Sequence, residues 1–310
     1  MPFSRIQLAV LGLVVSLILP ASAGAAFPGR NGEIAVSARF GCDGFEIDTV
    51  HRMGGERRRL TVSPCSAEGD GANNSAPDWS GDGRRLAFFA GFPANTFSTM
   101  APDGSAVTPL RFSPVGGRRL VPRPSFSRGG TRIAFTRGSA VWTARLDGTQ
   151  QRRLRSGLEP RYSPDGRMIA YVSVGATHPP ELWLMNARTG QRVRRLARGA
   201  GEPDWAPNGR SLVYARRTSG TSRDLFVVRA DGRATRRLTA SRTRDEFAPA
   251  WSPDGRWIAF AGGAGGERRE RGDIAYIPAR GGIRHTIVRV PPLDADTPFE
   301  AALSWRPMPA

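Results

Sequence analysis

Six charged residues in the sequence flank a repeated proline, and their types suggest either acid–base chemistry or a polar binding ring. These residues are Asp78, Arg123, Glu159, Arg161, Glu202 and Asp204. Two carboxyl groups that face one cavity are the machinery of glycoside hydrolysis, in which one donates a proton and the other acts as base or nucleophile. Carboxylates that alternate with arginines instead neutralise one another or hold a polar ligand. The distinction depends on the elements that position the proline.

The proline belongs to a motif that recurs along the chain. Residues 248–260 read APAWSPDGRWIAF, and related copies begin at Ala76, Arg123, Glu159 and Glu202. The Ser-Pro-Asp-Gly segment is typical of a type I turn followed by a left-handed glycine, so the motif predicts strand, turn and strand. Its aromatic residue recurs every 36 to 47 residues. This is the period of four-stranded propeller blades.

Each copy continues with a third apolar run, a Gly-containing turn and a fourth run that usually carries Arg-Arg-Leu. Each repeat therefore predicts four antiparallel strands, A to D. The glycine-and-apolar half of the motif occurs six times, and the proline-and-aromatic half does so if LSWRP at 303–307 is included. We expect an all-β, six-bladed β-propeller of four-stranded antiparallel blades. The C-terminal strand around Trp305 should close the ring by pairing with the strand around Ile34 of the first blade.

The apolar residues of the motif indicate how neighbouring blades pack. In strand B a small residue usually separates two larger apolar ones, as in Ile258-Ala259-Phe260. This pattern predicts a sheet covered on both faces, with the next blade close to the small residue. The repeated aromatic residue is interpreted as packing between blades rather than as a platform for sugars.

The copies of PAWSPDGRWIAF resemble the TolB-like six-bladed propeller repeat, whose signature is Pro-x-Trp-Ser-Pro-Asp-Gly followed by Ile-Ala-Phe. The resemblance covers essentially the whole chain after the first 25 residues, and it implies the propeller fold. TolB carries a separate α/β domain ahead of its propeller. Here AFPGRNGEIAV leads directly into the first blade, so we expect the chain to lack that domain.

Residues 1–25 have the pattern of a secretory signal peptide, and residues 26–310 are expected to form a single propeller domain. Arg5 precedes an apolar stretch at 6–19, and candidate cleavage sites follow Ala23 and Ala25. The stretch is too short for a membrane anchor, so no stable membrane insertion is expected. We expect an exported protein that is secreted, or periplasmic and associated with the cell envelope.

The two cysteines, Cys42 and Cys65, fall in the same repeat. One lies in the expected B–C loop and the other in the D–A loop, which emerge on one face of an up-and-down blade. Export favours a disulfide between them. Closing this loop would stabilise the fold by roughly 3 kcal/mol.

The net charge of +18 comes from arginine, since the sequence contains no lysine. A strongly basic chain is often a nucleic-acid protein. Here Arg-Arg pairs recur on strand D, the expected outer edge of each blade, where charge prevents edge-to-edge pairing. Charge spread around the perimeter, together with export, argues against a nucleic-acid partner.

Signals of catalysis, metal binding and cofactor binding are weak. No Gly-x-Ser-x-Gly elbow occurs, and the three histidines stand in separate repeats without ligand-like spacing. The Asp-Gly pairs of the C–D connections are interpreted as turns rather than calcium loops. We therefore expect no catalytic residue, no metal and no cofactor.

These observations favour a monomeric, non-catalytic binding module of the cell envelope, whose partner is an envelope protein or a cell-wall component. The B–C and D–A loops vary most, and the cluster Arg268, Arg269 and Arg271 in one of them is the candidate partner-binding loop. The six charged residues beside the prolines are candidates for a ligand-binding channel. The alternative is a propeller enzyme that acts on a glycan or lactone through carboxylates at the channel mouth.

Overall fold

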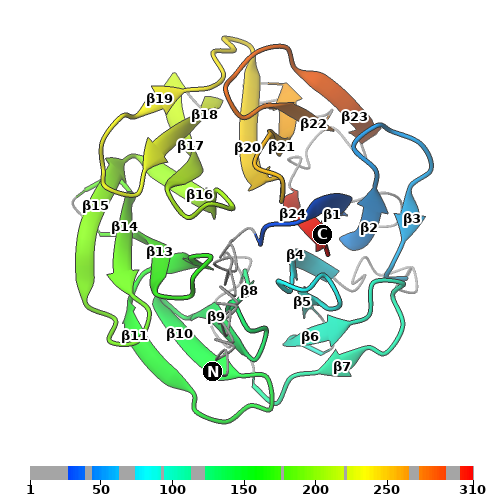
Figure 1. The fold of residues 1–310 in the computed structure, drawn as a ribbon, viewed down its shortest axis with the longest axis vertical. Helices are drawn as coiled ribbons and strands as arrows, with labels where there is room; N and C mark the ends of the chain where they lie inside the picture. The colour runs from blue at the N-terminus through cyan, green and yellow to red at the C-terminus, as the bar shows by residue number, and fades with distance from the viewer. Residues whose placement is uncertain are drawn as a thin grey trace, which may run out of the picture.

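The computed structural model describes residues 27–38, 44–62, 74–91, 94–112, 123–175, 178–219, 222–264, 272–290 and 301–309. These residues form six four-stranded antiparallel sheets arranged as the blades of a ring (Figure 1). All the regular elements described are strands, so this part of the chain offers no helix that is long and apolar enough to cross a membrane. The predicted six-bladed β-propeller is confirmed.

Each blade runs from strand A at the channel to strand D at the rim. Blade 1 contains β24 (Ala302–Met308), β1 (Arg30–Ala38), β2 (Glu46–Val50) and β3 (Arg58–Arg59). Blade 2 contains β4 (Asn74–Trp79), β5 (Leu86–Ala90), β6 (Thr96–Met100) and β7 (Thr108–Pro109). Blade 3 contains β8 (Ser125–Phe126), β9 (Arg132–Arg137), β10 (Ala140–Arg145) and β11 (Arg152–Ser156).

The second half of the ring follows the same order. Blade 4 contains β12 (Leu158–Tyr162), β13 (Met168–Ser173), β14 (Glu181–Asn186) and β15 (Arg192–Arg198). Blade 5 contains β16 (Ala200–Trp205), β17 (Ser211–Ser219), β18 (Ser222–Arg229) and β19 (Arg236–Arg237). Blade 6 contains β20 (Arg244–Trp251), β21 (Trp257–Ala264), β22 (Gly272–Pro278) and β23 (His285–Val290).

The two ends of the chain share blade 1 and close the ring. Strand β24 pairs with β1 so that Trp305 lies opposite Ile34, as predicted from the sequence. The indole Nε1 of Trp305 donates to the carbonyl of Gly32 at 3.0 Å. Each terminal segment covers an edge that the other would leave exposed.

The three residues of each strand B triplet pack against both neighbouring blades, as predicted from the sequence. Ile34 and Val36 pack against blade 6, whereas Ala35 between them packs against Trp79 of blade 2. The repeated aromatic residue is buried in every blade, and each one belongs to a different apolar cluster between neighbouring blades. These residues are Trp305, Trp79, Phe126, Tyr162, Trp205 and Trp251. The predicted packing role of the aromatic series is confirmed.

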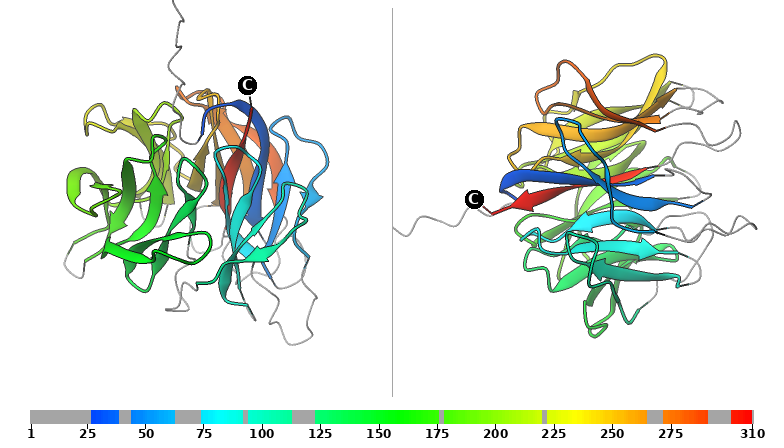
Figure 2. Two further views of the ribbon diagram at one scale, coloured as in Figure 1. Left: turned by 60° about the horizontal axis from the view of Figure 1, so that its bottom comes forward. Right: turned by 90° about the vertical axis from the view of Figure 1, so that its right-hand side faces the viewer.

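The two faces of the ring carry different connections. The turn face carries the A–B turns, such as 163–167, and the C–D turns, such as 187–191. The loop face carries the B–C and D–A connections, including 138–139, 199 and 238–243. In the right-hand view of Figure 2, the C-terminus of β24 marks the turn face on the left. On the turn face Ser252 donates to Asp254 at 2.6 Å and accepts the Trp257 N–H, which fixes the Ser-Pro-Asp-Gly turn.

The arginine pairs lie on the outermost strands, as predicted, but they also connect blades. The first arginine of a pair donates to carbonyls in the C–D turn of the next blade: Arg58 bonds Pro102 at 3.0 Å, and Arg236 bonds Arg280 at 2.7 Å. In blades 1, 4 and 5 the second bonds a carboxylate within its own blade, as Arg237 bonds Asp224 at 2.6 Å. The guanidinium groups therefore hydrogen-bond neighbouring blades at the rim of the ring and also give the rim its positive charge.

Deletion of residues 303–310 should lower the melting temperature by about 10 °C or more, because a buried Trp305 and the β24–β1 ladder are lost together. Thermal unfolding followed by circular dichroism measures this change. The single variant Trp305→Ala keeps the backbone ladder and should be destabilised by only about 3–5 kcal/mol. Unchanged melting of the truncated chain would contradict the closure.

Candidate functional site

The charged residues beside the repeated prolines lie on strand A, where four blades share a local distortion. The residue before the proline has a positive φ: 55° at Ala76, 52° at Glu159, 54° at Glu202 and 49° at Ala248. The A–B register shifts at the same places. Non-glycine residues seldom adopt this conformation, so a bond made outside the blade must compensate for its cost.

That bond comes from the preceding blade. The N–H of Ala76 donates to the Ser37 hydroxyl at 3.3 Å. The N–H of Glu202 donates to the Glu159 carboxylate at 2.5 Å, and the N–H of Ala248 donates to the Glu202 carboxylate at 2.7 Å. Each bulge thus turns a backbone donor away from its own sheet and toward a side-chain acceptor of the neighbouring sheet.

A second series of bonds runs through the residue after the proline. Its side-chain oxygen accepts the backbone N–H of the aromatic residue in the next blade. The bonds are Ser304 to Trp79 at 3.1 Å, Asp78 to Phe126 at 2.8 Å, Ser125 to Tyr162 at 3.1 Å and Asp204 to Trp251 at 2.7 Å. Asp78 and Asp204 therefore join blades as well as lining the channel.

Arg161 takes the place of such an acceptor in blade 4 and reaches across the channel. Its Nη1 lies 3.0 Å from Asp78 Oδ1 of blade 2 and donates to the Pro124 carbonyl of blade 3 at 3.1 Å. The carbonyl of Arg161 accepts the indole N–H of Trp205 at 3.1 Å. This buried arginine connects four blades.

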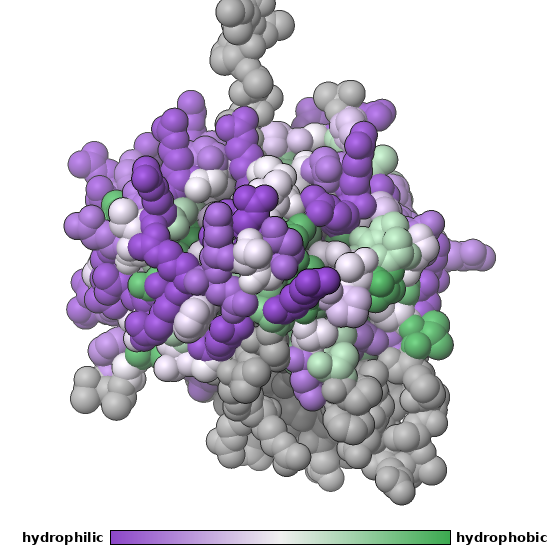
Figure 3. Space-filling view, turned by 90° about the horizontal axis from the view of Figure 1, so that it is seen from below, coloured by the Kyte–Doolittle hydropathy of each residue, from purple (hydrophilic) through white to green (hydrophobic). Residues whose placement is uncertain are grey.

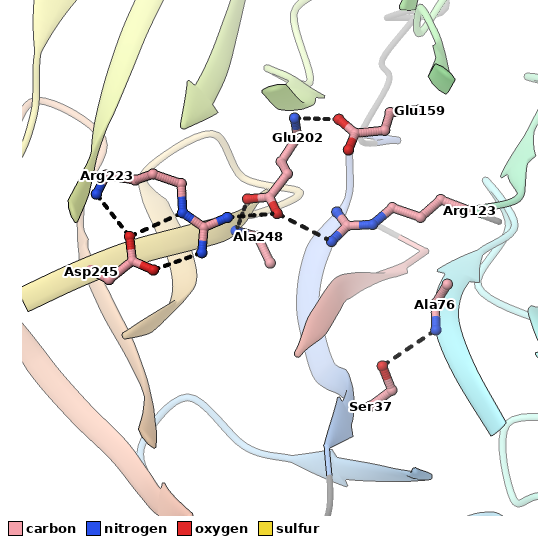
Figure 4. Close-up of polar contacts among 8 residues, drawn as sticks. All are labelled: Ser37, Ala76, Arg123, Glu159, Glu202, Arg223, Asp245 and Ala248. Atoms are coloured by element: carbon pink, nitrogen blue, oxygen red, sulfur yellow. Dashed lines mark hydrogen bonds and ion pairs between the residues drawn. The ribbon is translucent and has the colours of Figure 1, made fainter. Parts of the chain in front are cut away.

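Toward the loop face, Glu202 lies between two arginines (Figure 4). Its Oε1 lies 3.2 Å from Arg223 Nη1 and 3.7 Å from Arg123 Nη2. Arg223 also pairs with Asp245, with 2.7 Å between Nη2 and Oδ2, and lies over the Phe247 ring. Sequence analysis did not identify Arg223 and Asp245, because they stand outside the repeated motif and the fold alone brings them to Glu202.

Enclosure in the channel raises the pKa of Asp78, Glu159 and Asp204. Desolvation raises the pKa of Asp78 to about 7, against the opposing effect of Arg161. Desolvation likewise raises the pKa of Asp204 to about 6, although Arg161 and Arg123 favour its charged form. The pKa of Glu159 is raised by burial and by the charge of Glu202, while Arg123 opposes the shift.

The cavity beside these groups is small. It has a volume of about 30 Å³ and is lined by Asp78, Arg161 and Asp204 together with five of the six repeated aromatic residues, all but Trp205. This volume suffices for one or two water molecules, on the order of 15 Å³ each. Phe27 also lines it and lies against Gly81 of an A–B turn, and the segment leading into β1 begins near the centre of the ring in Figure 1.

The structure places all six candidate charged residues around the channel. Asp78 pairs with Arg161, Glu202 bonds Arg123 and Glu159, and Asp204 accepts the Trp251 N–H. Their role in binding a ligand stays a prediction. Cys42, Cys65 and the candidate loop residues Arg268, Arg269 and Arg271 lie outside the described residues, as does the signal segment 1–25. Within the described ranges, no cluster of three or more His, Cys, Asp or Glu side chains is arranged to hold a metal.

Comparison with known proteins agrees with this architecture. The TolB beta propeller domain matches residues 139–269, and TolB from Acinetobacter baumannii superposes with a TM-score of 0.68. The chain is a six-bladed propeller whose fold resembles that of TolB. Sequence identity to that structure is 19%, with 91% of this chain and 69% of the other covered. At such identity the likeness to a solved structure is one of fold.

Two further structures share the TolB-like fold. A putative TolB from Agrobacterium tumefaciens gives a TM-score of 0.64 at 18% identity, covering 90% of this chain and 99% of the other. A nidogen/laminin complex gives 0.62 at 13% identity, covering 88% and 98%. No curated protein matches the sequence.

The two raised aspartate pKa values predict that the TolB-like propeller is more stable in mild acid. A carboxyl group whose folded-state pKa is raised contributes stability that is complete below its ordinary value near 3.8 and is lost as the pH rises through the folded value. The unfolding free energy should therefore fall between pH 5 and pH 8, by on the order of 3 kcal/mol. Urea unfolding across this range measures the slope.

Asp78→Asn and Asp204→Asn should each flatten that slope, because an amide oxygen still accepts the backbone N–H but does not ionise. Asp82→Asn is the matched control, since Asp82 lies in a partly exposed turn where hydrogen bonds from Ser80 and Arg84 lower its pKa. A wild-type slope in both channel variants would show that these carboxyl groups do not govern the pH dependence.

Proposed function

We propose that the protein is an exported, non-catalytic binding module of the cell envelope that recognises a protein or a wall component through its loop face. The observation that carries the non-catalytic part is the bonding of the channel carboxylates. Asp78, Asp204, Glu159 and Glu202 each accept a backbone N–H from the next blade. A general acid or base must instead lie within reach of a substrate proton.

The volume of the cavity beside Asp78 and Asp204 supports the same proposal. Pockets for small molecules typically measure about 300–1,000 Å³. The cavity beside Asp78 and Asp204 measures about 30 Å³, and Arg161 lies among the carboxylates there. The alternative, an enzyme acting on a glycan or lactone, requires two carboxylates that face a cavity large enough for a sugar ring.

The loop face is favoured for binding because its connections vary while those of the turn face repeat. The A–B turns reuse one Ser–Asp hydrogen bond at Ser80, Ser163 and Ser252. The B–C and D–A connections differ from blade to blade in length and chemistry, from the single residue 199 to the seven residues GGERRER at 265–271. Variable loops on a rigid scaffold are where recognition usually resides. One fold neighbour was solved in a nidogen/laminin complex, so a ring of this shape is compatible with protein binding.

Export and location enter the proposal through the sequence alone. The pattern of residues 1–25 supports secretion, and the expected disulfide between Cys42 and Cys65 would stiffen part of the loop face. A rigid loop loses less conformational freedom when it binds. This favours recognition by a preformed surface.

The triple variant Arg268→Ser, Arg269→Ser and Arg271→Ser should reduce capture of the partner from the cell's own envelope fraction by about tenfold, because charged contacts at an interface are lost. Quantitative mass spectrometry of the captured proteins measures the effect. The melting temperature should stay within about 2 °C, since exposed surface substitutions seldom change stability.

The matched control replaces three arginines of the turn face, Arg210, Arg233 and Arg256, by serine. It changes the net charge equally and should leave capture intact. An equal loss of partner capture in both triple variants would show that capture depends on net charge and not on the loop, which contradicts the proposal. Turnover of a glycan that Glu202→Ala abolishes would instead establish the enzyme alternative.

A further inference from the structure

A groove on the turn face between blades 3 and 4 is not used by the network described above. Its volume is about 660 Å³. Blade 3 contributes Arg132, Gln150 and Arg152, and blade 4 contributes Tyr162, Gly166 and Arg188. The volume lies in the range of small-molecule pockets, about 300–1,000 Å³. Figure 3 shows the ring from the edge at the bottom of Figure 1, and that edge is mostly hydrophilic.

The charge of the groove is of one sign. Of the described residues that line it, three are arginines and none carries a carboxylate. Arg152 is fixed to the opposite wall, where it donates to the Arg188 and Thr189 carbonyls. Within the described part of the chain, the exposed Arg188 guanidinium has neither an ion-pair nor a hydrogen-bond partner. The lining of the groove therefore presents cationic donors with no carboxylate among them.

Two carboxylates in adjacent turns are already bonded. Asp147 accepts the N–H and hydroxyl of Thr149. Asp165 accepts the Ser163 hydroxyl and the Arg167 N–H. Each also pairs with an arginine of its own turn that is not part of the groove lining, Asp147 with Arg145 at 3.4 Å and Asp165 with Arg167 at 3.9 Å.

The neighbouring junction shows why the groove is open. Between blades 2 and 3, Arg85 donates to the Gly130 carbonyl at 2.8 Å and so covers the A–B turn of the next blade. Arg132 occupies the corresponding position in blade 3. Its Nη1 and Nη2 bond Gln150 of its own blade, at 2.6 Å to the side chain and 3.3 Å to the carbonyl. Gly166, which corresponds to Gly130, consequently remains part of the groove wall.

Gln150 is the residue that diverts Arg132. It has a positive φ of 50°, which is rare for glutamine. The corresponding turns of blades 2 and 5 hold Ala106 at 53° and Ala234 at 51°. The conformation thus belongs to the turn, whereas the long polar side chain is particular to blade 3. Within the described residues, the Gln150 amide nitrogen donates to no other group, so it is available to a ligand.

We propose that this groove binds an acidic polysaccharide through a carboxylate or phosphate on one of its sugar units. Guanidinium groups match both anions, and Arg132 and Arg188 supply them from opposite walls. The Gln150 amide complements sugar hydroxyls, which nucleic-acid backbones and acidic peptides present less densely, and the Tyr162 hydroxyl bonds the Arg132 side chain and so helps to hold it in the groove wall. The net charge of +18 attracts such a polymer from a distance.

Isothermal titration in 0.15 M NaCl tests the proposal with three polymers: polygalacturonate, poly(glycerol phosphate) and neutral dextran. The full-length protein should bind one or both acidic polymers but not dextran, and the pair of titrations distinguishes carboxylate from phosphate. Arg132→Gln with Arg188→Gln should weaken binding by about tenfold or more. Gln150→Ala, which installs the residue found in blades 2 and 5, should also weaken it.

The matched control is Arg210→Gln with Arg256→Gln, which removes two exposed arginines from A–B turns of the same face. It should change the affinity by no more than about twofold. Equal losses in the two double variants, binding of dextran, preference for duplex DNA over both polymers, or no binding at all would each overturn the proposal. If the double variant does not fold, the single variants Arg188→Gln and Gln150→Ala test the proposal: weaker polymer binding supports it, and unchanged binding contradicts it.

Discussion

The ring depends on backbone N–H groups that leave their own blade. At four bulges a positive φ directs the donor of strand A toward the preceding blade, where a hydroxyl or carboxylate accepts it. Packed sheets ordinarily meet through side chains, and their edge strands present unpaired N–H and C=O groups. Here the inner edge of one sheet is hydrogen-bonded to the next, so the relative position of these blades is fixed by directional bonds as well as by apolar contact.

This arrangement decides what the channel carboxylates are able to do. Burial makes an ionised carboxylate costly, and Arg161 offsets only part of that cost at Asp78. An inward-facing acid on a strand would elsewhere suggest catalysis, since perturbed pKa values gather at active sites. In this ring the perturbation has a structural cause, because each acid is held where the next blade presents a donor. The channel carboxylates thus hold neighbouring blades together.

Much of the fold could be predicted because short sequence motifs determine it. The Ser-Pro-Asp-Gly turn, the triplet with its small middle residue and the degenerate copy at Trp305 each specify structure over a few residues, and repetition makes the count reliable. The bonding of the site could not be predicted in the same way. Glu202 bonds Ala248 of the next blade, 46 residues further on, and Arg223 of β18 reaches Glu202 of β16 only once the sheet of blade 5 has formed. The positive φ before the proline has no signal in the residue types, which include alanine and glutamate.

The arginines illustrate the same limit at the rim. Their placement on strand D was readable from the repeat, but their partners are carbonyls of the next blade, which carry no sequence signal at all. Regular inter-blade bonds make departures from regularity informative. Arg85 covers the turn of the next blade, whereas Gln150 withdraws Arg132 from the equivalent task and leaves an open cationic groove. In a propeller of near-identical blades, a surface differs from its repeats where one blade lacks an inter-blade bond that another blade makes. Such a surface keeps polar groups that a ligand can contact.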